Sequence, residues 1–220
     1  MRYSGDVHSA TAKPGPAAMT RTQQRAAANR RAVVDAARGI ISDQGVEALT
    51  LEAVAEQADV AVQTIYNRVG GRAAVLTAVA EQALDESRVY MDPAYSAEGS
   101  VEQRLLLVTA AYARFARERP HEFRILVEPP HERDAVERIA AMTRTQNARL
   151  AGLLREGTDI GVLRADLDPD ELATALWATL NGLLALAWRP GSLRAEPEVI
   201  DRLVASYIAT VSEGLLARQP

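Results

Sequence analysis

The chain has 220 residues, of which 48% are hydrophobic and 25% charged, a composition typical of a globular protein with one or two domains. It has no cysteine, which excludes disulfides, thiolate metal sites and cysteine nucleophiles and agrees with a cytoplasmic setting. Residues 1–10 lack the apolar core of a signal peptide, and the charge-free run at 172–188 is short for a membrane span and contains polar side chains. We therefore expect a cytoplasmic protein with no membrane partner.

Charge is distributed unevenly along the chain, although the net charge is only −4. Residues 1–38 carry seven basic and two acidic side chains, whereas residues 73–220 carry 16 basic and 22 acidic ones. A basic N-terminal segment on an acidic body predicts an electrostatic contact with nucleic acid confined to one end. A solvated basic tail is the alternative explanation of the same pattern.

The first predicted elements follow a tail. Residues 1–20 contain Pro, Gly, Ser and Thr and are expected to be disordered and basic, with Met19 as an alternative start. Apolar spacing then predicts a helix over residues 22–43 that Gly45 ends. A second helix begins after Thr50, whose hydroxyl is expected to cap it.

A third helix occupies residues 62–69, after a tight turn at residues 59–60. Two short amphipathic helices joined by a turn make a helix-turn-helix, which places its second helix in the major groove of DNA. The outward face of this helix offers amide, hydroxyl and guanidinium groups and no carboxylate, which suits adenine and guanine edges. These predicted base contacts are Gln63, Thr64, Asn67 and Arg68.

The stretch "TLEAVAEQADVAVQTIYNRVGGRAAVL", residues 50–76, resembles the TetR family of one-component transcriptional regulators. The family pattern runs roughly T-x-x-x-I-A-x-x-A-G-V-S-x-x-T-L-Y-x-x-F-x-S-K-x-x-L. The chain departs from it at several positions, including Asp59 for Gly, Ala61 for Ser and Val69 for Phe. Asp tolerates the left-handed turn, whereas Ala61 cannot cap the third helix through a hydroxyl. The predicted phosphate contacts are Arg21, Arg25, Thr50, Tyr66 and Arg72.

Helical spacing continues to the C-terminus, so the expected fold class is all-α. A fourth helix is predicted over residues 73–89 and is expected to end before the loop "MDPAYSAEGS". Further helices are predicted from residue 101 to Pro120, over "PHEFRILVE", over 132–156, in the apolar run that ends at Trp188, and over 196–217. The resemblance implies about nine helices, the last two of which form a homodimer through a four-helix bundle.

Other kinds of site find little support in the sequence. Asp166, Asp168 and Asp170 alternate like the start of a calcium loop, but Asp168 before Pro169 is better explained as a helix cap. His121, His131 and Glu128 lack the spacing of metal ligands. We find no nucleophile elbow, phosphate loop or carboxylate pair, and therefore expect no enzyme activity, no cofactor and no metal.

Polar residues within apolar stripes have two possible explanations, which the sequence leaves open. An unpaired buried amide is costly, so each either bonds to a neighbouring helix or lines a cavity. On the second interpretation they orient a mostly apolar ligand together with aromatic neighbours. The candidate ligand residues are Tyr112, Phe115, Phe123, Met142, Thr143, Asn147, Trp177 and Asn181.

The predicted organisation is a tail over residues 1–20, a helix-turn-helix domain over 21–72, a connecting helix over 73–90 and a ligand-binding and dimerisation domain over 91–220. The predicted function is a ligand-responsive regulator, most often a repressor in this family. It would bind a near-palindromic double-stranded DNA operator and leave it when a small-molecule effector binds. The alternative is a helical ligand-binding or scaffolding protein whose helix-turn-helix no longer binds DNA, to which Ala61 and Val69 lend support.

Overall fold

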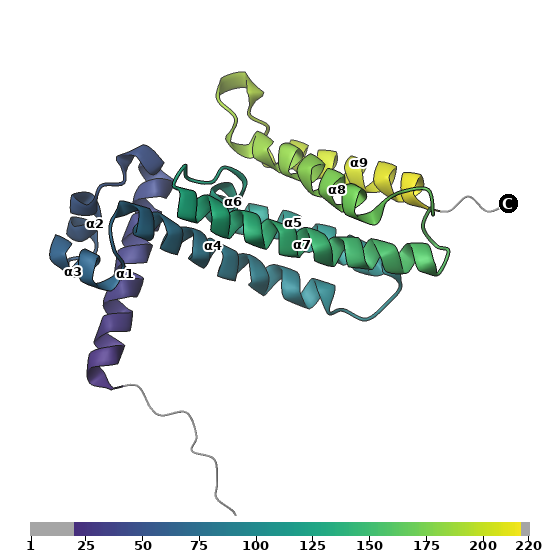
Figure 1. Ribbon diagram of the computed structural model, residues 1–220. Coiled ribbons are helices and arrows are strands. Elements are labelled where there is room, and N and C mark those ends of the chain that lie inside the picture. The colour runs from purple at the N-terminus through teal and green to yellow at the C-terminus, as the bar shows by residue number, and fades with distance from the viewer. Residues whose placement is uncertain (1–19, 217–220) are drawn as a thin grey trace, which may run out of the picture.

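The computed structural model describes residues 20–216 and consists, in that range, of α-helices and short 3-10 turns without strands (Figure 1). The predicted tail and the alternative start at Met19 lie outside the described residues, except for Thr20. The nine helices are α1 (Arg21–Gln44), α2 (Leu51–Gln57), α3 (Val62–Arg68), α4 (Arg72–Tyr95), α5 (Val101–Glu118), α6 (Pro120–Val127), α7 (Arg133–Asp159), α8 (Pro169–Leu184) and α9 (Pro197–Leu215). The all-α fold is therefore confirmed.

Helices α1 to α3 form a small unit, which we call the head. Its core contains Val33, Val54 and Ile65, all fully buried. The same cluster continues into the start of α4 through Val75 and Leu76, so the head packs directly on the fourth helix. Figure 1 shows the first half of α1 extending past α2 and α3.

Side-chain caps place the helix starts where the sequence predicts them. Thr50 Oγ1 accepts a hydrogen bond from the Ala53 amide and caps α2. Asp168 accepts from the amides of Asp170 and Glu171 at the start of α8, which confirms that this aspartate run begins a helix. A cap satisfies amides that have no partner within the helix.

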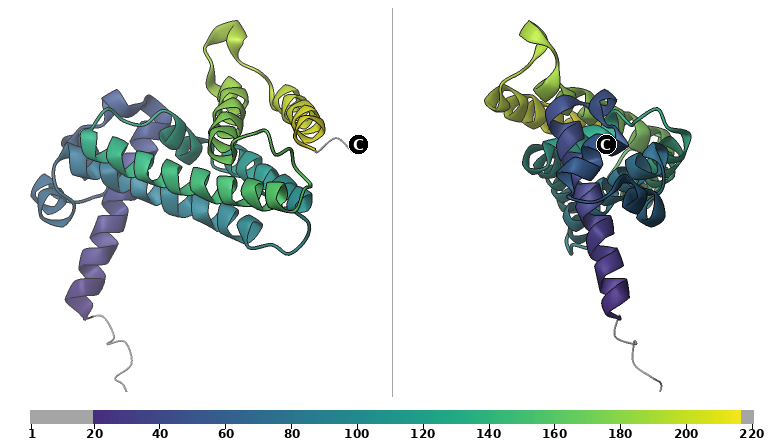
Figure 2. Two further views of the ribbon diagram at one scale, coloured as in Figure 1. Left: turned by 45° about the vertical axis from the view of Figure 1, so that its right-hand side comes forward. Right: turned by 90° about the vertical axis from the view of Figure 1, so that its left-hand side faces the viewer.

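Helices α4 to α9 form the larger unit, which we call the body. The long helices α4, α5 and α7 run side by side, and the short α6 packs against α4 and α5 (Figure 1). The pair α8 and α9 lies across this layer, as the left view of Figure 2 shows. Two apolar clusters fill the body, one around Met91, Val108 and Leu154 and one around Phe115 and Phe123.

Two helix ends differ from the sequence prediction. Helix α4 does not stop before residue 91 but runs to Tyr95 with Pro93 inside its last turn. Met91 and Ala94 are buried there, and Arg149 of α7 pairs with Asp92, so packing outweighs the missing amide of the proline. The apolar run of α8 ends as an α-helix at Leu184 and continues to Trp188 as a 3-10 turn.

Residues 20–216 contain neither a membrane-spanning helix nor a cluster of metal-ligand side chains. None of the helices there is both long and apolar enough to span a bilayer. In the same range, no group of three or more His, Asp or Glu side chains is arranged to hold a metal ion.

Candidate DNA-binding surface and effector cavity

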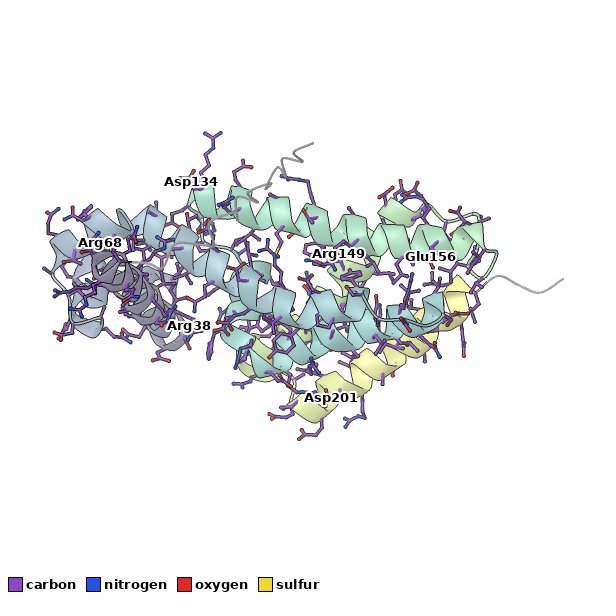
Figure 3. All side chains as sticks on the ribbon, turned by 90° about the horizontal axis from the view of Figure 1, so that it is seen from below. Arg38, Arg68, Asp134, Arg149, Glu156 and Asp201 are labelled. Carbon is purple, nitrogen blue, oxygen red and sulfur yellow. The ribbon has the colours of Figure 1, made fainter. Side chains whose placement is uncertain are left out.

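The polar face of α3 points away from the head. Ile65 is fully buried against α1 and α2 and fixes the helix, while Gln63, Asn67 and Arg68 are exposed on the opposite side. Gln63 Nε2 donates to Asn67 Oδ1 at 3.1 Å, one helical turn away, which links the two amides on the same face. Figure 3 shows Arg68 at the head end of the molecule. This face can donate and accept hydrogen bonds, and no side-chain partner holds Arg68 within residues 20–216.

The turns on either side of α3 have unusual backbone angles. Asp59 has a φ of 51°, the only positive φ of a non-glycine residue in the described range, so the left-handed turn predicted at this position is present. Gly70 has a φ of 124°, and a Cβ there would lie 2.7 Å from the Cβ of Ala74, so only glycine suits the exit from α3. Ala61 gives α3 no side-chain cap, as predicted.

The predicted phosphate-contacting residues surround this helix unevenly. Thr50 and Tyr66 are exposed in the head, Tyr66 with 53% of its surface accessible. Arg21 and Arg25 are exposed on the first turns of α1, in the part that projects past α2 and α3 (Figure 2). Thr64 is half-buried, so it offers less surface than the other three predicted base contacts.

Arg72 has internal partners that the sequence prediction did not include. Its Nε donates to the carbonyl of Leu49 and its Nη2 to that of Val46, both at 2.9 Å, and Nη1 pairs with Glu132. These bonds join the start of α4 to the loop before α2 and to the N-terminal end of α7. The guanidinium therefore supports the head from within, which differs from the phosphate contact predicted for it.

A cavity of about 280 Å³ lies in the body between α4, α5, α6, α7, α8 and α9. Five of the eight predicted ligand residues line it, namely Tyr112, Met142, Thr143, Asn147 and Trp177. Sequence reasoning missed several others, because an isolated serine or glutamine in a helix carries no signal of its own. These are Ser87, Met91, Tyr95, Gln146, Tyr207 and a set of leucines and valines from α5, α8 and α9.

The other three predicted residues lie outside the cavity lining. Phe115 and Phe123 are fully buried and stack edge to face, with ring centroids 6.0 Å apart, in the apolar cluster beside α6. Asn181 is also buried, but its Oδ1 accepts a hydrogen bond from the hydroxyl of Tyr112 at 2.7 Å. Asn181 therefore holds a cavity residue in place instead of facing the cavity itself.

The tyrosines around the cavity are protonated, and their hydroxyls already donate hydrogen bonds to other protein groups. Burial raises the pKa of Tyr112, and it raises the pKa values of Tyr95 and Tyr207 to about 12. The Tyr207 hydroxyl donates to the Leu176 carbonyl at 3.0 Å, as that of Tyr112 does to Asn181. These phenols thus present acceptor oxygens to the cavity instead of free donors.

Other polar groups of the cavity have no partner among the described residues. The Oε1 atom of Gln146 is buried and unpaired. Ser87, which is buried, and Thr143 and Asn147, which are half-buried, make no side-chain hydrogen bond within residues 20–216. All four lie on α4 or α7, whereas the walls from α5, α8 and α9 are mostly apolar and include the polar side chains of Glu102, Thr109 and Ser212.

Ion pairs connect the head to the body. Arg38 of α1 lies where the two units meet (Figure 3) and contacts Glu86 of α4 and Glu122 of α6, each at 3.0 Å. Glu122 is only 5% exposed although it is charged. Arg119, also near α6, contacts the second oxygen of Glu86 at 3.2 Å. Helix α4 is thus not the sole connection between head and body, because α6 reaches α1 directly.

Helices α8 and α9 expose faces with small side chains. On α8 these are Ala175, Ala178, Thr179 and Gly182, and a Cβ built at Gly182 meets no atom within 4 Å. On α9 Ala205, Ser206, Ala209 and Thr210 are exposed. Neither group contains a charge, so both faces allow close approach of another helix.

Both parts of the chain match known sequence families. Residues 33–79 match the family described as bacterial regulatory proteins, tetR family, and residues 105–211 match the tetracyclin repressor-like C-terminal domain. The first match contains the helix-turn-helix, and the second contains α6 to α8 and most of α5 and α9. No curated protein matches the chain in sequence at a significant level.

Solved structures share the fold at low sequence identity. The ketosteroid transcriptional regulator KstR2 of Mycobacterium tuberculosis is 17% identical, with 86% of this chain and 95% of that chain covered and a TM-score of 0.63. A protein with unknown function from Rhodococcus sp. RHA1 is 22% identical, with 86% and 95% covered and a TM-score of 0.68. A TetR-family transcriptional regulator from Agrobacterium tumefaciens is 14% identical, with 87% and 100% covered and a TM-score of 0.69.

Proposed function

Because this chain belongs to the TetR family of bacterial regulatory proteins, and is thus a DNA-binding transcriptional regulator and not an enzyme, we propose that it is a ligand-responsive repressor. In this proposal a homodimer occupies a near-palindromic operator. A small, mostly apolar molecule that binds in the body cavity causes the homodimer to dissociate from the operator.

The proposed contacts with DNA divide into two kinds. Gln63, Asn67 and Arg68, with Thr64 at their edge, contact base edges from the exposed face of α3. Arg21, Arg25, Thr50 and Tyr66 contact phosphates and set the position of the head on the duplex. Arg72 is left out of this second group because its guanidinium binds Leu49, Val46 and Glu132.

The proposed dimer forms through the exposed faces of α8 and α9. Each helix presents a face of small, uncharged side chains, and the same faces of a second copy would complete a four-helix bundle about a twofold axis. Such a dimer carries two copies of α3, and a twofold operator places its half-sites about 34–36 Å apart along the DNA. The regular spacing required by DNA then makes operator affinity depend on the distance between the heads.

The proposed response passes from the cavity to the head through α6 as well as through α4. Leu126 of α6 lines the cavity, and Glu122, one turn earlier on the same helix, holds Arg38 of α1. A ligand that displaces Leu126 would move Glu122, and with it the head. Ligand and DNA then oppose each other with a reciprocal coupling of roughly 1–3 kcal/mol.

The exposed polar face of α3 is the observation that carries this proposal. A gel shift with DNA taken from upstream of the protein's own gene tests it. The wild type should form a discrete complex that unlabelled random DNA does not displace, and Asn67→Ala should weaken it by about tenfold. Asn29 of α1 is half-buried and lies outside α3, so Asn29→Ala is the control and should leave the complex unchanged. Equal binding of upstream and random DNA by the wild type would favour a helical ligand-binding protein that no longer binds operator DNA.

A further inference from the structure

The body cavity has a charge pattern as well as a volume. Among the described residues that line it, Glu102 is the single charged side chain and none is Arg, Lys or His. Glu102 is half-buried in the first turn of α5. The hydrogen bond with Ser100 lowers the pKa of its carboxyl, so it is ionised at neutral pH.

Several arginines follow or precede lining residues in the sequence without lining the cavity themselves; among them, Arg88 pairs with Asp85 and Arg144 is exposed. Arg104 of α5 pairs with Glu156 of α7, and Arg149 of α7 pairs with Asp92 of α4. The Arg149 guanidinium also lies over the ring of Tyr95, 4.2 Å from its centroid. None of these arginines lines the cavity. A bound carboxylate or phosphate would therefore lose its water without gaining a cation, at a cost of several kcal/mol.

Most of the neutral polar groups without a side-chain partner in residues 20–216 lie on one wall, and Ser212 of α9 adds a further hydroxyl. Ser87 and Thr143 offer hydroxyls, and Asn147 and Gln146 offer amides, all from α4 or α7. The facing walls contribute side chains such as Leu105, Leu176, Val211 and Leu215. Neutral donors and acceptors satisfy an alcohol, ketone or amide, which costs little to desolvate once it is hydrogen-bonded.

We propose that the effector is an uncharged amphiphile, whose hydroxyl, carbonyl or amide groups bond to Ser87, Thr143, Gln146 and Asn147 while its hydrocarbon part packs against α5, α8 and α9. This inference rests on the proposed function of the cavity and narrows its ligand. It excludes free fatty acids, phosphorylated compounds and acyl thioesters of phosphorylated carriers. Glu102 is explained by its place at the start of α5, where the free amides of a helix favour a carboxylate, without a cationic ligand.

A chain-matched series of probes tests the proposal with the full-length protein. The probes are 1-decanol, decanoate and decylammonium, which share a hydrocarbon chain and differ in head group. The chain has two tryptophans, and Trp177 lines the cavity, so a Trp188→Phe background makes Trp177 fluorescence a reporter of the cavity alone. At about pH 8, where a free carboxyl is ionised, 1-decanol should bind at least tenfold more tightly than decanoate. Decanoate should bind more tightly as the pH is lowered, because the neutral acid is the form that enters.

A variant designed to gain decanoate binding provides a second test of the proposal. Asn147→Lys places a cation on the polar wall and should reverse the order of decanol and decanoate. Ala148→Lys adds the same charge to the exposed side of α7 and should leave the order unchanged. Decanoate binding as tightly as decanol at high pH, or no response to decanol, would overturn the inference. Tightest binding of decylammonium, weakened by Glu102→Gln, would overturn it in favour of a cation site.

The same samples separate this inference from the proposed function. Operator binding is measured by gel shift at the decanol concentration that saturates Trp177. The expected result is the predicted probe order together with weaker operator binding. If the probes bind in the predicted order of affinity but operator binding does not change, the proposed ligand response is contradicted and the proposed ligand class is supported. Release of the operator by decanoate at high pH would support a ligand response and contradict the proposal that the ligand is uncharged.

Discussion

The head and the body use their polar side chains in opposite ways. In the head, α3 buries Ile65 and turns Gln63, Asn67 and Arg68 towards solvent. In the body, α7 turns Thr143 and Asn147 towards an internal cavity. The polar surface of the head therefore follows from residue spacing along one short helix, whereas the site in the body exists only when six helices enclose a cavity. This contrast suggests that DNA contacts and ligand contacts can be altered independently, and that only the connections between the units affect both.

The strongest challenge to that independence is to disrupt the dimer, because a change in the body should then abolish DNA binding. Gly182→Arg adds a long charged side chain to the exposed face of α8, where a Cβ meets nothing within 4 Å, so the monomer fold should tolerate it. We expect sedimentation to show a monomer. Operator affinity should fall by about 100-fold or more, because the second head no longer binds intramolecularly.

Gly152→Arg is the matched control for this dimer prediction. Gly152 is exposed on α7 and a Cβ there also meets open space. This variant should stay dimeric and bind the operator as the wild type does. A dimeric Gly182→Arg protein would show that the dimer does not form through this face of α8. A monomeric one with undiminished operator affinity would show that operator binding does not depend on the dimer.

Two arginines separate recognition from support within the head. Arg68→Ala should cost about 1–3 kcal/mol on the cognate operator and alter base preference, because a lost side-chain contact to a base edge is specific. Its melting temperature should hardly change, because Arg68 is exposed and has no internal ion pair within the described residues. Gel shifts against substituted operators measure both effects.

Arg72→Ala should behave in the opposite way. It leaves the carbonyls of Leu49 and Val46 without their charged donor and Glu132 without its partner, so the free energy of unfolding should fall by about 1–3 kcal/mol. Thermal denaturation measures this loss. If the Arg72→Ala protein instead kept its stability but bound all DNA sequences more weakly and with a flatter salt dependence, the result would support the phosphate contact that the sequence predicts.

Glu122 tests whether the units communicate through α6. Glu122→Gln keeps the shape of the side chain but removes the charge that attracts Arg38, which retains Glu86. We expect operator affinity without ligand to change little, whereas the coupling between ligand and DNA should weaken by about 1 kcal/mol. Operator titrations with and without a cavity ligand give the coupling.

The control for Glu122 is an ion pair confined to the body. Glu156 pairs with Arg104 between α5 and α7, and Figure 3 shows it at the end of the molecule away from the head. Glu156→Gln should leave the coupling unchanged. Equal loss of coupling in both variants would mean that general loosening of the body, and not the contact between α6 and α1, lowers the response.

The head could be predicted from the sequence in detail because its determinants are local. The cap at Thr50, the turn at Asp59 and the buried Ile65 each depend on residues within one or two helical turns. Arg72 is the exception in the same region. Its partners lie 23, 26 and 60 residues away in the sequence, and a local sequence pattern cannot predict contacts over such separations.

The cavity could be predicted only in part for the same reason. Helical spacing places Thr143 and Asn147 on an inner face, and both line the cavity. It also places Asn181 on an inner face, yet Asn181 bonds to Tyr112, 69 residues away, and lies behind the lining. Periodicity tells which face of a helix is buried, but not whether another side chain or an open space lies opposite.

The smallest expected effect concerns the turn that sets the angle between α2 and α3. Asp59 is exposed and has a φ of 51°, so its contribution to stability comes from the backbone. Alanine at this position should lower the free energy of unfolding by about 1 kcal/mol, because it lacks the short polar side chain that eases the left-handed conformation. Glycine relieves the strain but loses about 0.4–1 kcal/mol through the greater entropy of the unfolded chain, so Asp59→Gly should be nearly neutral.

A second exposed aspartate provides a control for the loss of the aspartate side chain, because the stabilities of its alanine and glycine variants can be compared in the same way. Asp43 lies in the last turn of α1, where right-handed helical backbone favours alanine over glycine by about 0.5–1 kcal/mol. Glycine should therefore be the more stable replacement at position 59 and alanine at position 43. Thermal denaturation of the four variants gives the two orders, with differences of a few degrees expected for about 1 kcal/mol. If alanine were preferred at both positions, the left-handed turn would not be a requirement of the head, and the angle of α3 would depend on the packing of Ile65 alone.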